Sequence, residues 1–334
     1  MSSIFFSMIM PVLNSERTIE KALCSIREQD FPQDRIEILV IDGGSKDRTL
    51  EIAEKYNVRI LENKQVIPET AKQIGIQKAR GEWIVFFDSD EVLTDKRQLG
   101  RRYYFLKSNP DVYCYKVNRL IPGENSGFCC PYLNIVSDPF SYVVYKNKGS
   151  FIKTNKKHLK YKNAGYVYEY QDKDVIPVGD GGNTSVSLKK ARELFGEEVN
   201  TQEFAVSAFS QVASATHYIG CIPGDNIRHY SAAKMTNYLK KLRFRVNINL
   251  NEAEKSGYSA REKYNAPLSK RKWVFLAYCL TGIGPVYDSL KLACFYHRPS
   301  FLLHFFYTYY VFFAAAAEMA GKIFKCGGRK YTYG

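Results

Sequence analysis

Residues 84–91 read IVFFDSDE, so that four apolar residues run directly into Asp88, Ser89, Asp90 and Glu91. A continuous apolar run that ends in polar residues is typical of a buried strand in a sheet covered on both faces. The acids then fall at the carboxyl end of the strand, which is where α/β sheets bind ligands. This stretch predicts an α/β fold with a binding site at one edge of its sheet.

The residues before this stretch alternate between strand-like and helix-like patterns. Strands are predicted over 3–12, 36–42, 58–62 and 83–88, and helices lie between them. Strands that alternate with helices of this length indicate a mostly parallel sheet with helices on both faces.

Short polar residues and glycine mark the expected ends of these helices. Asn14 or Ser15 is the predicted N-cap of the first helix, and Asp47 or Ser45 that of the second. A third helix is predicted over 68–79, before Gly81.

Polar residues also follow the first two predicted strands. Residues 11–16 read PVLNSE and residues 42–45 read DGGS. Each motif alone is common in turns and helix caps, but three in order after strands of one α/β unit favour a shared site. Carboxylates gathered at one edge repel and raise each other's pKa, and a divalent cation relieves that. Oxygen ligands without a Cys or His pair suit Mg²⁺ or Mn²⁺, which usually binds a phosphate ligand as well.

Together these motifs resemble inverting glycosyltransferase family 2, over residues 4 to about 93. The family's P-x-x-N-x-E segment is matched by Pro11, Asn14 and Glu16, and its D-[DG]-G-S-x-D-x-T segment by residues 42–49. KARGEW and FFDSDE match the end of the helix and the DxD strand end. The resemblance implies the GT-A fold, a Rossmann-like nucleotide-binding mixed sheet with helices on both faces, and a metal-dependent, inverting enzyme.

The resemblance also implies which residues bind a nucleoside-diphosphate sugar and its metal. Asp88 would contact the ribose or the metal, and Asp90 would ligate the metal that bridges the diphosphate. Gln73 stands where many members have Asn, which leaves the donor contacts of its helix open. The residues expected to bind the nucleotide sugar are Pro11, Val12, Leu13, Asn14, Glu16, Asp42, Gly43, Gln73, Asp88 and Ser89.

The acceptor side is expected in the second half, from 111 to about 250, where residues 178–188 resemble the family's G-x-G-N segment. Gln202-Glu203 stands where members have Glu-Asp, so Glu203 is the candidate general base. The alternative is an acid that only stabilises a helix N-terminus.

Three further residues after position 220 are candidates for metal and phosphate binding. His229 is a candidate third metal ligand, and the alternative is an ordinary histidine at a strand end. Arg243 and Arg245 are candidate contacts of the diphosphate, with lipid headgroups or solvent as alternatives.

The positive charge of the chain is concentrated in its last third. The net charge is +14, and residues 228–334 hold 18 Lys and Arg against 5 Asp and Glu. Long apolar, aromatic segments at 273–290 and 299–321 are interleaved with these charges, which favours anionic lipid over nucleic acid as the partner. Because basic residues flank every apolar segment, helices in the membrane interface or a re-entrant hairpin fit better than a simple span. The alternative is buried helices of a soluble core.

The sequence therefore predicts a glycosyltransferase domain over 1–250, with a nucleotide-sugar half at 1–110 and an acceptor half at 111–250. Residues 251–334 form a basic, aromatic-rich helical tail, peripheral, monotopic or re-entrant at the cytoplasmic face of a membrane. Eight cysteines without a CxxC pair indicate reduced thiols.

The expected reaction moves one sugar to a hydroxyl of a lipid-linked or saccharide acceptor, in polysaccharide biosynthesis or protein glycosylation. A polyprenyl-linked saccharide is the favoured acceptor, and the missing Q-x-x-R-W motif of processive synthases favours single addition. The alternatives are a nucleotidyltransferase, or a non-catalytic relative that acts as a membrane-bound interaction protein. Oligomeric state is left open.

Overall fold

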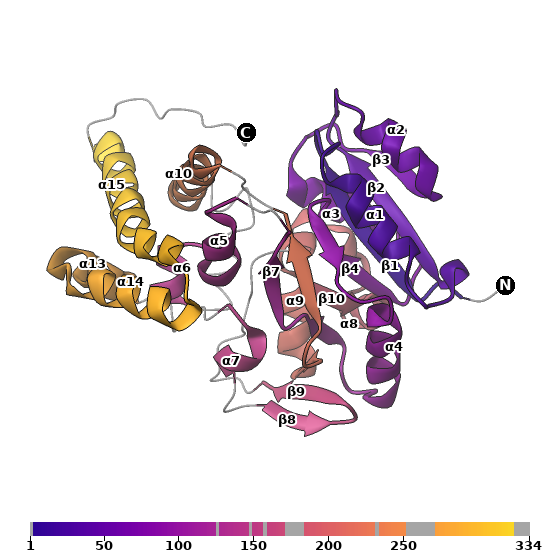
Figure 1. The fold of residues 1–334 in the computed structure, drawn as a ribbon. Helices are drawn as coiled ribbons and strands as arrows, with labels where there is room; N and C mark the ends of the chain where they lie inside the picture. The colour runs from indigo at the N-terminus through magenta and orange to yellow at the C-terminus, as the bar shows by residue number, and fades with distance from the viewer. Residues whose placement is uncertain are drawn as a thin grey trace. The chain divides into compact units, whose positions relative to one another are not determined.

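The computed structural model describes residues 3–124, 127–146, 149–155, 159–170, 184–230, 234–251 and 271–323 (Figure 1). The chain divides into two compact units. Met1–Ile121 and Ser150–His229 form the first, and Pro122–Gly149 and Tyr230–Gly334 form the second. These bounds differ from the expected boundary near residue 250, and the assignment of functions to the two parts stays a prediction.

The first unit contains a mixed sheet of nine strands in the order β3-β2-β1-β4-β10-β6-β11-β9-β8. β1 pairs in parallel with β2 and β4, and β2 with β3. β10 is antiparallel to both of its neighbours, so the expectation of a mixed sheet is confirmed. The strands are β1 (Phe6–Val12), β2 (Ile36–Asp42), β3 (Arg59–Glu62), β4 (Trp83–Phe86), β6 (Cys114–Lys116), β8 (Leu159–Lys162), β9 (Gly165–Glu169), β10 (Thr184–Ser187) and β11 (Tyr218–Cys221).

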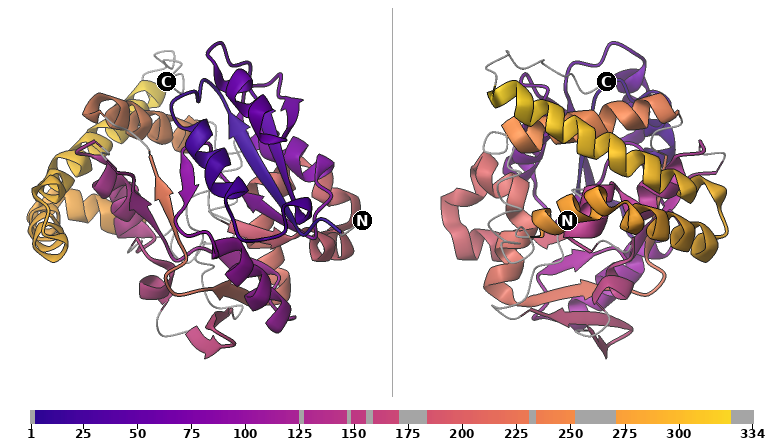
Figure 2. Two further views of the ribbon diagram at one scale, coloured as in Figure 1. Left: turned by 45° about the vertical axis from the view of Figure 1, so that its right-hand side comes forward. Right: turned by 90° about the vertical axis from the view of Figure 1, so that its left-hand side faces the viewer.

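Helices cover both faces of this sheet (Figures 1 and 2). The even-numbered residues of β1 share a hydrophobic core with the apolar face of α1, because alternate residues of a strand point to one face. On the other face, a Cβ at Gly75 of α3 would lie 2.4 Å from Ile9 Cγ2, so α3 packs directly on β1. The helices are α1 (Ile19–Arg27), α2 (Thr49–Ala53), α3 (Pro68–Lys78), α4 (Gln98–Ser108), α7 (Phe151–Asn155), α8 (Leu188–Phe195) and α9 (Gln202–Thr216).

The N-termini of the first two helices differ from the predictions. α1 begins at Ile19, and neither Asn14 nor Ser15 caps it. α2 begins at Thr49, and neither predicted residue occupies its N-cap position. The loop residues bind the neighbouring loop instead, as the Oδ1 atom of Asn14 does when it accepts from the backbone N–H of Lys46 at 2.9 Å. The predicted N-caps were wrong because these polar residues form hydrogen bonds between the two loops instead.

A small sheet in the order β5-β12-β7 lies beside the DSDE turn. β5 (Glu91–Leu93) begins with the last acid of that turn, and β12 (Asn226–His229) pairs with it in antiparallel fashion. The register places His229 opposite Glu91. The third strand is β7 (Arg119–Pro122).

The second unit is helical in its described residues and has an aromatic core. The rings of Tyr132, Tyr238 and Tyr307 contact one another, and Phe301 packs against Tyr132. Among the described residues, one helix, Pro299–Lys322, is long and apolar enough to cross a membrane, and 39% of its most apolar window is buried. The helices are α5 (Cys130–Val136), α6 (Pro139–Val144), α10 (Met235–Asn251), α13 (Lys272–Thr281), α14 (Ile283–Tyr296) and α15 (Leu303–Ile323).

Parts of two predictions lie outside the described residues. Residues 178–183 of the predicted G-x-G-N segment are among them, and β10 and α8 follow directly. The last basic residues of the tail, from 324 onward, are outside as well.

Candidate functional site

Three loops leave the sheet of the first unit at the carboxyl ends of β1, β2 and β4. The strands are parallel, with Val12 paired to Asp42 and Ile9 paired to Phe86. The segments that follow these strands therefore emerge at one edge. They contain the three motifs that the sequence singled out.

The first loop is joined to the second by hydrogen bonds in both directions. The backbone N–H of Asn14 donates to Ser45 Oγ at 2.9 Å, and that of Glu16 donates to Asp47 Oδ2 at 3.1 Å. In return, the backbone N–H of Arg48 donates to Glu16 Oε2 at 3.2 Å. These hydrogen bonds hold the two loops together. One of the two carboxylate oxygens of Glu16 takes part in them.

Asp42 is buried at the end of β2 and organises the second loop. Its carboxylate accepts from the backbone N–H of Gly44 at 3.0 Å and from the hydroxyl of Ser45 at 2.6 Å. Gly44 has a φ of +92°, which suits glycine at this turn. The backbone N–H of Gly43 donates to the Val12 carbonyl at 2.9 Å, so the turn is tied to β1. The acid therefore has a structural role in its own turn.

The first residues of the nucleotide-binding prediction line the edge next to this turn. Pro11 and Val12 belong to β1, and the Leu13 side chain beyond the strand is 40% exposed. Val66 lies opposite, since a Cβ on Gly43 would lie 3.4 Å from Val66 Cγ1. An apolar surface therefore lies beside the polar loops.

The third loop folds around Glu91, which is buried. The backbone N–H of Asp88 donates to Glu91 Oε2 at 3.0 Å, and the N–H of Glu91 donates to the Asp88 carbonyl at 3.0 Å. The hydroxyl of Ser89 donates to Ser15 Oγ at 2.9 Å, which joins this loop to the first. Glu91 thus shapes the turn, whereas Asp88 and Asp90 stay half-buried at its surface.

His229 lies beside Asp90, with 3.3 Å between His229 Nε2 and Asp90 Oδ2. The pairing of β12 with β5 creates this contact. Within the part of the chain that the structure describes, no group of three or more His, Cys, Asp or Glu side chains is arranged to hold a metal ion. The chemistry of Asp88, Asp90 and His229, two carboxylates and an imidazole, nevertheless fits Mn²⁺ or Mg²⁺.

Gln73 points to the chain just before α9. Its Nε2 donates to the carbonyl oxygen of Asn200 at 2.8 Å, and Gln77 Nε2 donates to the same oxygen at 2.8 Å. A carbonyl has two lone pairs, so one oxygen satisfies both amides. The contact links α3, which packs on the sheet, to the start of α9.

Glu203 lies in the first turn of α9 and is exposed. Thr201 caps this helix, because its Oγ1 accepts from the backbone N–H of Phe204 at 3.1 Å. Among the described residues, the Glu203 carboxylate forms no hydrogen bond or ion pair, and its backbone carbonyl accepts from the hydroxyl of Ser207 at 2.7 Å. Its catalytic role stays a prediction.

Arg243 and Arg245 belong to the second unit, where each lies next to an acid. Arg243 is 2.7 Å from Glu318, and Arg245 is 3.3 Å from Asp138. Their predicted contact with a diphosphate therefore stays a prediction.

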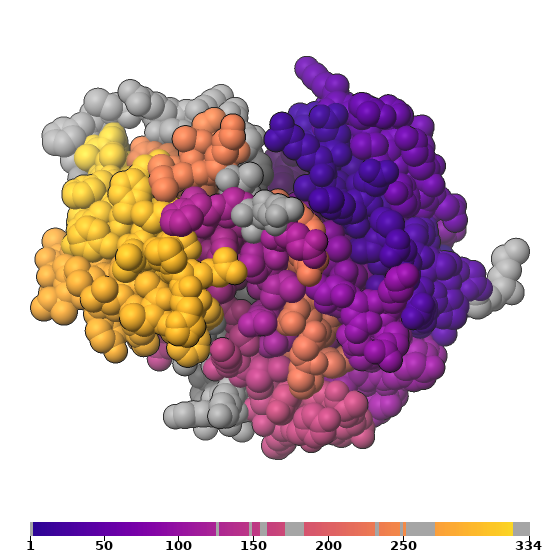
Figure 3. All heavy atoms as spheres, viewed as in Figure 1, coloured from indigo at the N-terminus to yellow at the C-terminus, as the bar shows by residue number. Residues whose placement is uncertain are grey.

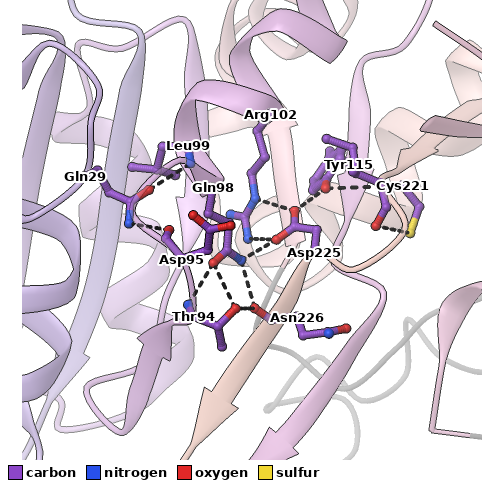
Figure 4. A network of polar contacts seen from close by, with 11 residues as sticks. Gln29, Thr94, Asp95, Gln98, Leu99, Arg102, Tyr115, Cys221, Asp225 and Asn226 are labelled. Atoms are coloured by element: carbon purple, nitrogen blue, oxygen red, sulfur yellow. Dashed lines mark hydrogen bonds and ion pairs between the residues drawn. The ribbon is translucent and has the colours of Figure 1, made fainter. Parts of the chain in front are cut away.

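Sequence reasoning missed a buried network around Asp225, in the turn before β12 (Figure 4). Arg102 of α4 donates to both carboxylate oxygens of Asp225, at 2.6 and 3.0 Å, and Tyr115 and Gln98 donate as well. Burial alone would lower the pKa of Arg102, but the charge of Asp225 and its hydrogen bonds outweigh this and raise it. The network anchors the start of the strand that carries His229.

The signal available in the sequence was the stretch PGDN at 223–226, which is rich in turn-forming residues. Gln98 Nε2 also donates to the Asn226 carbonyl at 2.8 Å, so the amide that binds Asp225 also holds the first residue of β12.

Comparison with known proteins shows similarity in both sequence and fold. Residues 7–128 match the family model described as Glycosyl transferase family 2. The chain is 33% identical over 153 residues to poly(ribitol-phosphate) beta-N-acetylglucosaminyltransferase TarS of Staphylococcus aureus, covering 43% of this chain and 27% of TarS. It is 37% identical over 92 residues to glycosyltransferase AglE of Haloferax volcanii, covering 26% of this chain and 30% of AglE. The matched part thus spans less than a third of either relative.

Among solved structures, mannosyltransferase PcManGT from Pyrobaculum calidifontis superposes with a TM-score of 0.52 at 14% identity, over 98% of this chain and 89% of that one. The mixed sheet, with its polar loops at the carboxyl edge of β1, β2 and β4, is a GT-A fold. Residues 7–128 of this fold are thus similar to glycosyltransferase family 2.

Proposed function

We propose that the protein is an inverting glycosyltransferase that transfers one sugar from a nucleoside-diphosphate sugar to an acceptor hydroxyl. The observation that carries the proposal is the joining of three loops by hydrogen bonds at the carboxyl edge of parallel strands, within a family 2 domain. The names of the relatives support it, since TarS and AglE are both glycosyltransferases.

The donor nucleotide would bind along the first two loops. Asp42, Glu16 and the surface around Leu13 are the groups expected to contact base and ribose, and Asn14 holds the loop that presents them. UDP and GDP are the first candidates, because TarS is named for N-acetylglucosamine transfer and PcManGT was solved with GDP-Man.

A divalent cation, Mg²⁺ or Mn²⁺, would be held by Asp88, Asp90 and His229. PcManGT was solved with Mn²⁺, and the donor atoms here suit the same ion. When bound, the ion supplies Lewis-acid neutralisation of the charge on the leaving diphosphate. The chain's own part is to hold the ligands in place, through Glu91 for the DSDE turn and the Asp225 network for β12.

Glu203 would act as the general base. It would take the proton of the acceptor hydroxyl while that oxygen attacks the anomeric carbon and the bond from this carbon to the diphosphate breaks. One displacement without a covalent intermediate inverts the anomeric centre. An exposed carboxylate in the first turn of a helix is open to an acceptor.

The acceptor would be a saccharide or a lipid-linked saccharide, in polysaccharide biosynthesis or protein glycosylation. Basic and aromatic helices in the second unit favour a location at the cytoplasmic face of a membrane. A polyprenyl-linked acceptor suits that location.

Thermal unfolding in the presence of UDP, GDP and their sugar conjugates, with and without Mn²⁺, tests the donor site. A ligand that binds the native state raises the unfolding temperature by mass action. We expect one diphosphate to stabilise the wild type only with metal and Asp90→Ala to lose this effect. Glu62→Ala, which removes an exposed acid at the end of β3, should keep it. If no nucleotide raises the unfolding temperature of the wild type, the result would indicate a non-catalytic relative.

Glu203→Gln separates catalysis from binding. A true base loses turnover while metal-dependent nucleotide binding persists. Proton NMR of an early product should show the anomer opposite to that of the donor, and retention would contradict the mechanism.

A further inference from the structure

The helices α13, α14 and α15 carry apolar side chains on two faces. One face of each is buried in the core of the second unit, through Phe275, Leu292 and Tyr307. The other is exposed, and Figure 3 shows side chains of α15, in yellow, at the surface. Helices of soluble proteins usually have one apolar stripe, and helices that are apolar all round are covered on every side. The outer face is therefore a surface that lacks its cover.

This outer apolar face is large and rich in aromatics. Exposed fractions reach 71% for Trp273 and 75% for Ile283. Large apolar side chains exposed at several neighbouring positions of packed helices mark a site of interaction. Six of its residues are Trp273, Leu280, Ile283, Tyr287, Leu290 and Phe313.

Every exposed charged side chain within residues 271–322, all of which the structure describes, is basic. The two acids of this range are turned to protein partners. Asp288 accepts from the hydroxyls of Tyr142 and Tyr278, at 3.2 and 3.0 Å, and Glu318 accepts from Arg243 at 2.7 Å. The exposed basic residues are Lys272, Lys291, Arg298 and Lys322. Within residues 271–322, the apolar, aromatic face is thus accompanied by exposed charges of positive sign only, and this combination is complementary to anionic lipid.

The lengths of the helices favour docking in the interface over crossing. α13 has 10 residues and α14 has 14, so they are about 15 and 21 Å long at 1.5 Å per residue. A hydrocarbon core is about 30 Å thick, so neither helix spans it. α15 is long enough, but His304 and Thr308 of its inner face lie in the core of the unit. The helices lie side by side, as Figure 2 shows at the right.

We propose that the outer face of α13, α14 and α15 docks on the surface of an anionic lipid bilayer. The turn at Gly282 would insert first, because Leu280 and Ile283 flank it with exposed fractions of 70% and 75%. Lys291 and Arg298 would contact phosphate groups of lipids. This inference deepens the proposed membrane location, and it depends on lipid binding rather than on sugar transfer.

Flotation of the full chain with vesicles tests the surface. Vesicles of phosphatidylcholine alone are compared with vesicles of equal parts phosphatidylcholine and phosphatidylglycerol. The wild type should float with the second kind, and Ile283→Glu or Leu280→Glu should lower partitioning on the order of tenfold or more. Tyr104→Glu is the matched control, because Tyr104 of α4 is 72% exposed but lies in the first unit. It should bind like the wild type.

Charge is tested separately. Lys291→Gln and Arg298→Gln should each weaken binding to anionic vesicles about fivefold, which corresponds to ~1 kcal/mol per basic residue. Added salt should weaken the wild type in the same direction.

The inference is overturned if the wild type does not float, or if Tyr104→Glu loses as much binding as Ile283→Glu. It is also overturned if the wild type is a dimer that Ile283→Glu dissociates and no form binds vesicles, because a second copy then covers the face. Thermal shift with UDP or GDP is recorded on the same samples. If the wild type fails to float but binds a nucleotide, only the inference about this surface is contradicted. If it floats but binds no nucleotide, only the proposed function is contradicted.

Discussion

The Nε2 atom of His229 lies 3.3 Å from the Oδ2 atom of Asp90, because the strand that ends with His229 pairs with the strand that follows the DSDE turn. Neither side chain reaches this position through its own loop alone. The register of two short antiparallel strands, anchored at its far end by the buried Asp225 network, places the imidazole beside the carboxylate. The proposed metal site would therefore depend on residues outside its own ligand set.

The first prediction concerns His229 itself. Replacing a metal ligand lowers metal affinity, and changes around such ligands already cost about 10–100-fold. We expect His229→Asn to weaken Mn²⁺ binding in the presence of a nucleoside diphosphate at least about tenfold. His297→Asn in the second unit is the control, since Asn tolerates its left-handed backbone, with a φ of +51°. Calorimetric titration of Mn²⁺ decides, and equal affinity in both variants would remove His229 from the site.

The second prediction assigns a positioning role to Gln73 and Gln77. Their amides converge on the Asn200 carbonyl and so hold the start of the helix that carries Glu203. We expect the double change to Ala to lower kcat about tenfold to a hundredfold, because small misplacements of a catalytic group are costly. The KM for the donor should stay unchanged.

Each single variant keeps one donor to the Asn200 carbonyl and should lose much less than the double variant. Lys78→Ala, on an exposed position of α3, is the control. A rise in donor KM for Gln73→Ala alone would show instead that Gln73 contacts the nucleotide sugar, as the family resemblance implied.

Local signals predicted the three loops at the carboxyl ends of β1, β2 and β4. The buried strands β1, β2 and β4 are mostly apolar, and the loops after them contain the Gly, Asn and Asp residues that turns require. Parallel order then follows from the alternation of strands and helices. The sequence could therefore predict that these three loops lie close together in space.

Contacts between segments that are distant in the sequence could not be predicted from it. The pairing of β12 with β5 involves strands of three and four residues, too short for a periodic signal. The partners of Asp225 come from α4 and β6, and no pattern in the sequence connects them. The predicted N-caps of α1 and α2 were wrong for the same reason, because only the folded chain shows that Asn14 binds Lys46.

The third prediction tests the buried network. Arg102 and Asp225 are 2% and 1% exposed, and removing one partner of a buried ion pair leaves the other charge without compensation. Asp225→Asn should lower the free energy of unfolding by roughly 3–5 kcal/mol in urea titrations. Asp95→Asn, which breaks a half-exposed pair with Arg101, should cost only about 0–1 kcal/mol. Similar losses in both variants would contradict the importance of burial here.

The fourth prediction concerns the amino ends of the strands, where Glu37 is the second residue of β2. Burial alone would raise its pKa, but hydrogen bonds from Ser7, Arg80 and Arg59 outweigh burial and lower the pKa below the ordinary 4.5. The native state therefore keeps this carboxylate ionised at a lower pH than the unfolded chain does. Its stabilising contribution is present above about pH 4.5 and is lost as the pH falls through the native pKa.

We expect Glu37→Gln to lower the free energy of unfolding at neutral pH by roughly 1–3 kcal/mol, because buried partners lose charge-assisted hydrogen bonds. The difference from the wild type should shrink as the solution is acidified, whereas the exposed Glu62→Gln shows no such trend. Metal-dependent nucleotide binding should be unaffected, since Glu37 lies at the amino end of β2 and Asp42 at its carboxyl end. A difference that is constant with pH would mean that Glu37 stabilises the sheet by packing rather than by its charge.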